Sequence, residues 1–325
     1  MKKFTTALAT AAAAIALFTG GAQADGHQCG EVQITEMDWA SAIMITAVSK
    51  FIMEQGYGCD VTVVPSSTEP SIVSLAERGK PDIVTELWVN STPSYDKLVE
   101  EGKVETLTNV LSDGGVEAWW IPAYLAETNP ELTTIEGVMA APEKVGGKFH
   151  NCPTGWGCRT VNDNVIEAMN LSEKLEIFNH GSGETLAASI ASAYEAKEPW
   201  IGYYWAPTAI LGKYPMVPVS VGDYDAEVHK CNTSADCATP GVSPYPSSRV
   251  ITAATTDFIE REPAVADLMK KLSFTNQQMG EILSWKEANK ATAEEAAVYF
   301  LTNYGDVWQA WLNDEAKTKL SALIK

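Results

Sequence analysis

The N-terminal part of the chain alternates short apolar runs with longer segments of helical period. Three runs, Val32–Ile34, Val61–Val64 and Asp82–Leu87, have the length and composition of buried strands. Between them, apolar pairs recur near helical period over Ala40–Glu54, and a second helix is predicted over Glu69–Glu77. Alternating strands and helices favour an α/β fold, in which a parallel sheet is covered by helical crossovers.

A second pattern of the same kind begins after a break at Pro122, where polar residues interrupt the apolar runs. It includes a helix over Glu184–Glu195 and a buried strand over Trp200–Trp205. From Val221 to Ser248 the chain is rich in Pro, Ser, Asp and Cys, which is typical of a long surface excursion. A strand over Val250–Ala254 and three helical segments are predicted for the rest of the chain.

These two patterns predict two lobes joined by a hinge that the chain crosses twice, near Ile121 and Ser247. We expect the first lobe to comprise residues 25–121 together with 248–325, and the second to comprise residues 122–247. A chain of 325 residues is long enough to build two domains with separate cores.

The first 24 residues are typical of a signal peptide. Lys2 and Lys3 precede a short apolar stretch at residues 7–18, and the sequence Ala-Gln-Ala at 22–24 matches a small-residue cleavage site. The apolar stretch is too short to span a membrane. We therefore expect a mature chain that begins at Asp25 and is exported to the periplasm.

The charge of the chain excludes some classes of partner. Its net charge at pH 7 is −19, which argues against binding to nucleic acid or to an anionic membrane surface. We expect a monomer that binds a small molecule.

The six cysteines form three pairs. Two pairs are only six positions apart, and the cysteines of the third each precede a strand-like run. If these two strands are parallel neighbours, their N-terminal ends lie side by side. Metal binding is the competing interpretation, but no pair has the two-residue spacing of zinc sites. For an exported chain we predict disulfides and neither a metal nor a cofactor; the predicted pairs are Cys29–Cys59, Cys152–Cys158 and Cys231–Cys237.

Tryptophans mark a candidate binding site. Trp39, Trp88 and Trp205 each lie at or just past the C-terminal end of a strand-like run. In open α/β sheets this edge faces the ligand crevice. Aromatic faces that converge on a crevice bind quaternary ammonium groups, because the ring quadrupole attracts a cation that cannot hydrogen-bond. A place in the core is the alternative for each of these side chains.

The loop between Cys152 and Cys158 presents Trp156 between two glycines, so no neighbouring side chain packs against the indole. Gly157 and Cys158 precede a helix predicted over Thr160–Met169, and a helix N-terminus attracts a carboxylate. We predict that the indole binds the cationic end of a ligand and that the backbone N–H groups of Gly157 and Cys158 bind its anionic end.

Carboxylates accompany three of the tryptophans. Glu36, Glu86 and Glu117 lie two or three residues before Trp39, Trp88 and Trp119. On a strand, a two-residue offset puts Glu86 on the same face as Trp88. We predict that Glu117 and Trp119 border the site. A carboxylate inside a cage favours a cation such as choline, and it also accepts a proton from protonated trimethylamine N-oxide. A solvated or salt-bridged acid is the alternative.

No enzyme signature stands out, since the chain has no H-E-x-x-H, G-x-S-x-G or Walker motif. We therefore predict a binding protein and not an enzyme. An exported hydrolase that uses the same cleft stays an alternative, but it needs a nucleophile that the sequence does not indicate.

The chain resembles the periplasmic substrate-binding proteins of ABC importers for glycine betaine and proline betaine. The resemblance runs over most of the chain after residue 24. Its matching segments are Leu87-Trp88, the cysteine-closed loop 152–158 and Gly202–Pro207, of which the loop is the most specific. It implies a type II-like periplasmic binding protein fold, whose two α/β lobes close on the ligand.

The resemblance also assigns roles to single residues. Trp88 from the first lobe, with Trp156 and Trp205 from the second, would form the ammonium cage. The N–H groups of Gly157 and Cys158 would hold the ligand carboxylate.

Some positions depart from the family pattern. Thr92 stands where a histidine is expected, and Arg159 follows the loop where an acid is expected. Trp39 and the pair Trp119-Trp120 are additional aromatics. These departures resemble a branch that includes trimethylamine N-oxide binders.

We therefore expect a periplasmic binding protein that delivers a methylated ammonium osmolyte to an inner-membrane ABC permease. Glycine betaine is the first choice, and trimethylamine N-oxide or choline are the alternatives. A sensory or chemotaxis binding protein with the same fold is the alternative class.

Overall fold

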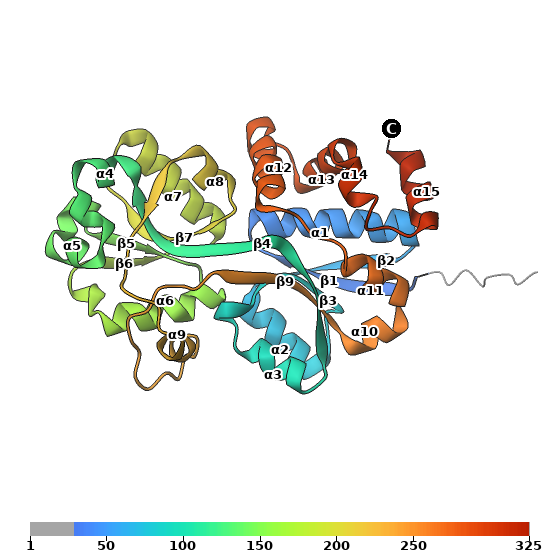
Figure 1. Cartoon of the computed structure of the whole chain (residues 1–325), viewed down its shortest axis with the longest axis horizontal. Coiled ribbons are helices and arrows are strands. Elements are labelled where there is room, and N and C mark those ends of the chain that lie inside the picture. Colours follow the sequence, from blue (N-terminus) through green and yellow to red (C-terminus); the bar gives the residue numbers. More distant parts are fainter. Residues whose placement is uncertain (1–28, 325) are drawn as a thin grey trace, which may run out of the picture.

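The computed structural model describes residues 29–324. The predicted signal peptide and its cleavage site lie outside the described residues. Two lobes lie side by side and are bridged by long strands (Figure 1). We call the part built on strands β1 (Glu31–Met37), β2 (Asp60–Ser66), β3 (Ile83–Trp88) and β9 (Ser248–Thr255) the first lobe. The second lobe is the part built on β5 (Lys148–Asn151), β6 (Glu176–Asn179) and β7 (Ile201–Ala206).

The first lobe begins with the predicted pattern of strands and helices. Strand β1 lies between β2 and β3 and pairs with both in parallel. Helices α1 and α2 are the crossovers, and a π-helical turn at Met53–Tyr57 continues α1. The bounds are β1 Glu31–Met37, α1 Ala40–Ile52, β2 Asp60–Ser66, α2 Thr68–Arg78 and β3 Ile83–Trp88, with α3 at Ser94–Glu100. The strand and helix predictions for this region are confirmed.

The register between β1 and β2 explains the first disulfide. Glu31 pairs with Asp60, so the residues just before the two strands are neighbours. Cys29 and Cys59 are bonded there, as the parallel arrangement predicts. The two local disulfides, Cys152–Cys158 and Cys231–Cys237, are also present.

One long strand, β4 (Val104–Pro122), joins the lobes, and the sequence pattern did not predict it. Its first part pairs antiparallel with β9 (Ser248–Thr255), as far as Gly115 opposite Ser248. From Val116 onward it pairs with β7 (Ile201–Ala206) and then with β8 (Met216–Pro218). The first chain crossing near Ile121 stays a prediction, and this change of partner favours Gly115 for it.

The complete sheet is mixed and not purely parallel as the alternating pattern suggested. Its strand order is β2-β1-β3-β9-β4-β7-β5-β6, with β8 on β4. Strand β9 runs antiparallel to both β3 and β4, and β7 runs antiparallel to β4. Strand β4 therefore carries the chain from the first lobe to the second, and the antiparallel strand β9 carries it back.

The second lobe covers its strands with helices on both faces (Figure 1). Strand β5 pairs in parallel with β6 and β7. The surface excursion after Val221 contains helix α9, which packs near α6. The bounds are α4 Ala123–Thr128, α5 Ile135–Ala140, β5 Lys148–Asn151, α6 Gly157–Ala168, β6 Glu176–Asn179, α7 Gly183–Ala196, α8 Ala209–Lys213 and α9 Ala226–Asn232.

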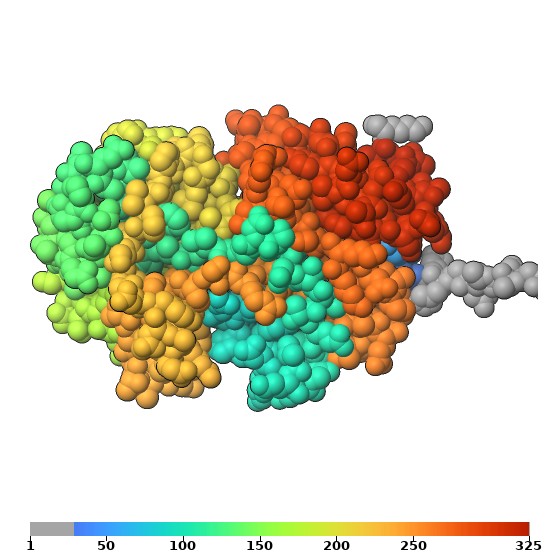
Figure 2. Space-filling model, in the orientation of Figure 1, coloured from blue at the N-terminus to red at the C-terminus, as the bar shows by residue number. Residues whose placement is uncertain are grey.

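After β9 the chain forms more helices than the three segments predicted, and α13 packs on α1 of the first lobe. Their bounds are α10 Thr256–Arg261, α11 Pro263–Met269, α12 Asn276–Asn289, α13 Ala293–Asn303, α14 Gly305–Trp308 and α15 Asp314–Leu323. No helix within residues 29–324 has the length and apolarity to cross a membrane. The space-filling view shows that the lobes touch along the middle of the molecule (Figure 2).

Candidate functional site

A pocket lies where the two lobes meet, and both lobes contribute side chains to it. The residues that line it are Trp39, Thr68, Trp88, Ser91, Glu117, Trp156, Gly157, Cys158, Tyr203 and Trp205. All the residues predicted to bind ligand are among them except Trp119. Residues that are far apart in the sequence thus form one aromatic site with a single carboxyl group on its lining.

The two tryptophans of the first lobe are positioned by hydrogen bonds from their indole N–H groups. Trp39 is the residue that precedes α1, and Trp88 is the last residue of β3. Both indole N–H groups donate to Oε1 of Glu86, at 2.6 Å from Trp39 and 3.4 Å from Trp88. The Trp88 indole lies over Gly115 of β4, where a Cβ atom would come within 2.2 Å of the ring. Glycine at this position therefore leaves the space that the indole occupies.

The two tryptophans of the second lobe complete the aromatic walls. Trp156 meets Trp39 edge to face at 5.0 Å between ring centroids and meets Trp205 in the same way at 5.1 Å. Gly183, at the start of α7, makes room for Trp156, since a Cβ atom there would lie 2.9 Å from its ring. The indole N–H of Trp156 donates to Oδ1 of Asp38 at 2.7 Å. Because Asp38 belongs to the first lobe, this bond joins the lobes at the pocket.

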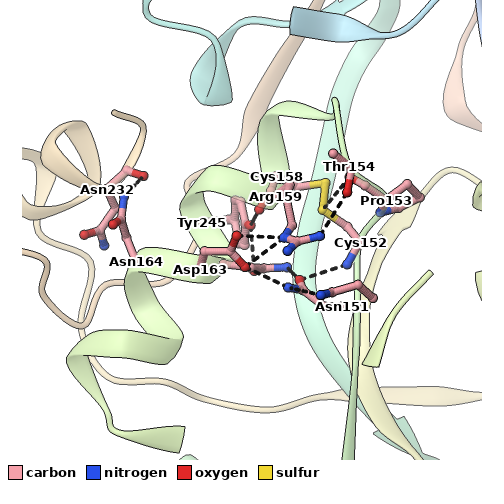
Figure 3. Close-up of polar contacts among 12 residues, drawn as sticks. Asn151, Cys152, Pro153, Thr154, Cys158, Arg159, Asp163, Asn164, Asn232 and Tyr245 are labelled. Carbon is pink, nitrogen blue, oxygen red and sulfur yellow. Dashed lines mark hydrogen bonds and ion pairs between the residues drawn. A yellow bond between two sulfur atoms is a disulfide. The ribbon is translucent and has the colours of Figure 1, made fainter. Parts of the chain in front are cut away.

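The loop that carries Trp156 is fixed at both ends (Figure 3). Besides the Cys152–Cys158 disulfide, the Asn151 side chain accepts from the backbone N–H of Cys152 and donates to Asp163. Arg159 forms an ion pair with Asp163 and donates to Thr154. Arg159, which stands where the family pattern has an acid, therefore stabilises the loop.

Helix α6 begins directly at Gly157, three residues earlier than predicted for Thr160. The N–H groups of Gly157 and Cys158 are therefore first-turn groups, which have no acceptor in a preceding turn of helix. A Cβ atom at Gly157 would lie 2.6 Å from the carbonyl oxygen of Ser91 in the first lobe. The absence of a side chain at Gly157 is what lets the two lobes approach so closely here.

A backbone bond also crosses between the lobes beside this loop. The N–H of Glu69 in α2 donates to the carbonyl oxygen of Gly155 at 3.0 Å. Gly155 has φ +90°, a left-handed conformation that glycine adopts without steric cost. The loop therefore contacts the first lobe through backbone atoms as well as through Trp156.

Glu117 of β4 is buried in the lining of the pocket. The Tyr203 hydroxyl donates to its Oε1 at 2.9 Å, and the Ser248 hydroxyl donates to its Oε2 at 2.8 Å. Burial raises the pKa of the Glu117 carboxyl, and these hydrogen bonds oppose that rise. Burial therefore favours the protonated form of this carboxyl group, and its hydrogen bonds favour the ionised form.

Trp119 does not reach this pocket. It lies on the same strand as Glu117, but its indole packs on Phe149 at 4.5 Å between ring centroids and donates to Asn162. Phe149 belongs to β5, which is separated from β4 by β7 in the sheet, and its ring packs against the indole of Trp119. Trp119 supports the second lobe and does not line the cage.

Three lining residues were missed by the sequence prediction. Tyr203 stacks near Trp205, from which it is separated by two positions along β7, so strand alternation could have indicated it. Thr68 is the first residue of α2, and Ser91 ends the single 3-10 turn that follows Trp88; neither position has a periodicity that marks its side chain as inward-facing.

Comparison with known proteins identifies the family. A family model described as the substrate-binding domain of an ABC-type glycine betaine transport system (OpuAC) matches residues 30–303. The chain belongs to this family. Members of the family are transport proteins that bind substrate outside the cytoplasmic membrane.

Three individual proteins are similar to this chain over most of its length. The trimethylamine N-oxide-binding protein of Pelagibacter ubique (strain HTCC1062) is 24% identical over 327 residues, which cover 95% of this chain and 98% of the relative. An ABC-transporter choline-binding protein in complex with choline has a TM-score of 0.73 at 21% identity, over 91% of this chain and 99% of that one. Lactococcal OpuAC in its closed form with glycine betaine has a TM-score of 0.69 at 15% identity, over 87% and 100%. The two structural likenesses confirm the two-lobed fold.

Proposed function

We propose that this protein captures a small methylated ammonium or amine-oxide solute between its lobes and hands it to an ABC permease. The observation that carries the proposal is the convergence of Trp39, Trp88, Trp156 and Trp205 on one interlobe pocket. Aromatic faces around a desolvated cation are the standard chemistry for recognising a quaternary ammonium group. Family membership supports the same class of function.

The expected binding free energies show that the aromatic side chains alone do not give tight binding. Each desolvated cation–π contact contributes about 1–2 kcal/mol, so four give roughly 4–8 kcal/mol. Micromolar binding requires about 8 kcal/mol. The polar end of the ligand must therefore be bound as well, and the pocket offers Glu117 and the N–H groups of Gly157 and Cys158 for it.

Trimethylamine N-oxide is the ligand that we place first. The Glu117 carboxyl, whose pKa is raised by burial, donates its proton to the oxide oxygen, and the helix N-terminus favours the negative charge on that oxygen. Glycine betaine, the first choice from sequence, brings a carboxylate next to Glu117, and two carboxylates in a buried site repel each other. The relative that binds trimethylamine N-oxide supports this order.

Choline is the second candidate, because Glu117 accepts hydrogen bonds on both oxygens. The Tyr203 and Ser248 hydroxyls both stabilise an ionised carboxylate, which would balance the charge of a cationic ligand. The choline complex among the structural neighbours has the same fold.

Titration calorimetry with trimethylamine N-oxide, choline, glycine betaine, dimethylsulfoniopropionate and proline tests the function. The Glu117→Gln variant separates the two leading ligands. Glutamine still donates to an oxide oxygen, so trimethylamine N-oxide loses little affinity, whereas choline loses the counter-charge and binds at least tenfold more weakly, a change of about 1.4 kcal/mol. Glu105→Gln, an exposed carboxylate on the same strand, is the matched control. Failure to bind any methylated onium compound contradicts the proposed function.

We also propose export to the periplasm with removal of residues 1–24, and function as a monomer. The mass of the mature protein purified from the periplasmic fraction tests the cleavage before Asp25. A chemotaxis receptor as the partner, in place of the permease, would be indicated if deletion of the gene for this protein abolished chemotaxis toward the solute and left its uptake intact.

A further inference from the structure

Glu86 is a buried carboxyl group for which the proposed binding mode has no use. Its side chain has no exposed surface, and it does not line the pocket. Three donors converge on its Oε1: the indole N–H groups of Trp39 and Trp88, and the Ser41 hydroxyl at 2.8 Å. Its Oε2 is buried and has no hydrogen-bond partner within the described part of the chain. A carboxyl group is therefore bound to the outer edges of two cage tryptophans.

The backbone at Glu86 departs from a regular strand to achieve this. Its φ is +51°, and the register between β3 and β9 shifts between Val84 and Leu87. A left-handed conformation costs a residue with a side chain about 1 kcal/mol or more, so it persists only where surrounding contacts maintain it. The predicted strand alternation placed Glu86 and Trp88 on one face, and this irregularity turns the carboxyl behind the indole instead of into the pocket.

Among residues 29–324, no charged side chain compensates the Glu86 carboxyl. The groups that act on it are the Ser41 hydroxyl and the two indoles, and no charged side chain is among them. The nearby carboxyl groups of the site are otherwise engaged, Asp38 with Trp156 and Glu117 with Tyr203 and Ser248. Burial raises the pKa of Glu86 to about 7, which its three hydrogen bonds oppose.

We propose that Glu86 couples the capture of an onium cation to the release of a proton. It holds the N–H edges of Trp39 and Trp88 so that their faces line the pocket, and it ionises when a permanent positive charge occupies that pocket. One proton leaves the Glu86 carboxyl for solvent as one cation enters, so the charge of the closed site is balanced. This inference rests on the proposed function, since it requires that the cage binds an onium group.

The physical reason is that a ring with a carboxylate on its N–H edge is a better cation receptor. A hydrogen bond to an ionised acceptor is stronger than one between neutral groups, and it adds negative charge behind the ring face that the cation meets. The effect is reciprocal: if ionised Glu86 favours the cation, the bound cation lowers the pKa of Glu86.

The sign of the pH dependence follows. Well above pH 7 Glu86 is ionised with or without ligand, and affinity is highest. As pH falls through the pKa of the free protein, the cation must displace a proton, so the affinity decreases. The total decrease is about tenfold for each unit by which the bound cation lowers the pKa.

The test uses tetramethylammonium, which carries no polar group for Glu117, and its neutral counterpart 3,3-dimethyl-1-butanol. Dissociation constants are measured from pH 5.5 to 8.5 on the full-length mature protein. Calorimetry in two buffers of different ionisation enthalpy counts the protons released. For tetramethylammonium we expect the affinity to increase in a single step as the pH rises, together with release of protons on binding. For the neutral alcohol we expect an affinity that does not change with pH.

Variants test whether Glu86 causes the change of affinity with pH. Glu86→Gln keeps an acceptor for the indoles but cannot ionise, so it removes the step and binds about tenfold more weakly at pH 8.5 for a one-unit coupling. Ser41→Ala removes one donor that stabilises ionised Glu86, so it moves the midpoint of the step to higher pH without altering a residue that lines the pocket. Ser49→Ala is the matched control, since Ser49 is a buried serine of the same helix whose hydroxyl has no partner within residues 29–324, and its midpoint stays unchanged.

The outcomes separate the two proposals. A step that survives Glu86→Gln but disappears in Glu117→Gln overturns the inference, and so does normal tetramethylammonium binding with no pH step. If Glu86→Gln does not fold, an unchanged midpoint in Ser41→Ala overturns it by itself. Absence of binding by every methylated onium compound at every pH overturns the proposed function instead, and the inference falls with it.

Discussion

The two halves of the aromatic cage are built in different ways. In the first lobe, Trp39 and Trp88 share an acceptor, Glu86, that belongs to their own lobe. In the second lobe, Trp156 is presented by a disulfide-closed loop, and its N–H finds its acceptor, Asp38, on the opposite lobe. The first half is therefore complete within one lobe, whereas the second reaches its final contacts only when the lobes meet.

This difference separates two tasks that a binding protein must combine. A half-site that is preformed within one lobe lowers the entropic cost of binding, because its side chains are already ordered. A half-site whose contacts form across the cleft makes closure favourable only when the pocket is correctly filled. We expect substitutions in the first half to alter stability and affinity together, and substitutions in the second half to alter affinity and closure more than stability.

The largest effect is expected from truncating one tryptophan in each half. Trp88→Ala leaves a cavity against Gly115 and removes a donor to Glu86, so it should lower the free energy of unfolding by about 3–5 kcal/mol. Trp156→Ala should leave the unfolding of the ligand-free protein nearly unchanged and weaken onium binding by about 5–30-fold, the equivalent of one cation–π contact. Chemical denaturation and titration calorimetry measure the two quantities. If Trp88→Ala and Trp156→Ala lower the free energy of unfolding equally, the two halves of the cage do not differ in the way proposed.

The disulfides give the next largest effect. Cys29–Cys59 closes a span of 30 residues in the first lobe, and its removal should cost about 4 kcal/mol of stability. Cys152–Cys158 closes a span of 6, and its removal should cost about 2 kcal/mol. In affinity we expect the opposite order. Replacing Cys152 and Cys158 by alanine should weaken ligand binding more than replacing Cys29 and Cys59, because only Cys152–Cys158 shapes the loop of Trp156. The comparison fails if the Cys29–Cys59 variant weakens binding more than the Cys152–Cys158 variant does.

A methyl group at the contact between the lobes should weaken binding without unfolding either lobe. In Gly157→Ala the new Cβ atom meets the carbonyl oxygen of Ser91, and this overpacking costs about 1–3 kcal/mol only when the lobes are closed. We expect affinity to fall by about 5–150-fold, with an unchanged melting temperature of the ligand-free protein. Gly181→Ala, where a Cβ atom has nothing within 4 Å, is the control. An unchanged affinity of Gly157→Ala would show that the lobes close without this contact.

The smallest effect is expected at the bond between Asp38 and Trp156. Asp38→Asn keeps an oxygen acceptor but loses its charge, so the hydrogen bond weakens by about 1 kcal/mol and affinity by about fivefold. Small-angle scattering of the ligand-bound variant should show a larger share of open molecules. Asp60→Asn, an exposed carboxylate at the start of β2, should change neither quantity. A loss of stability in place of a loss of affinity would mean that the bond acts within the ligand-free fold.

Much of the first lobe could be predicted from the sequence, because its strands and helices alternate with a clear period. The same periodicity failed for β4, in which the burial pattern changes where the strand passes from β9 to β7. A strand that serves two lobes does not have one buried face along its length, so its apolar residues do not alternate regularly. The crossing predicted near Ile121 lies close to the end of this strand, whereas the strand changes its partner after Gly115.

The site shows the same division between local and non-local information. Trp156, Gly157 and Cys158 could be identified from a loop whose composition is unlike that of a core segment. Trp119 has the same residue type as the cage residues and lies two positions after Glu117 on β4, but its indole packs on Phe149 and does not line the pocket. Residue type and position along a strand therefore indicated candidates but could not distinguish those that line the cage from those that support it.

The sequence by itself determined the aromatic residues of the cage, the three disulfides and the alternation of elements that brings strand ends to one crevice. These depend on residue type and on short-range spacing, which a chain carries before it folds. Only the tertiary structure decided which carboxylate holds which indole. The bonds from Trp39 to Glu86 and from Trp156 to Asp38 span 47 and 118 positions, and the first depends on an irregular turn of the backbone that no periodicity encodes. Such contacts are set by how the lobes pack, so they become visible only once both lobes are in place.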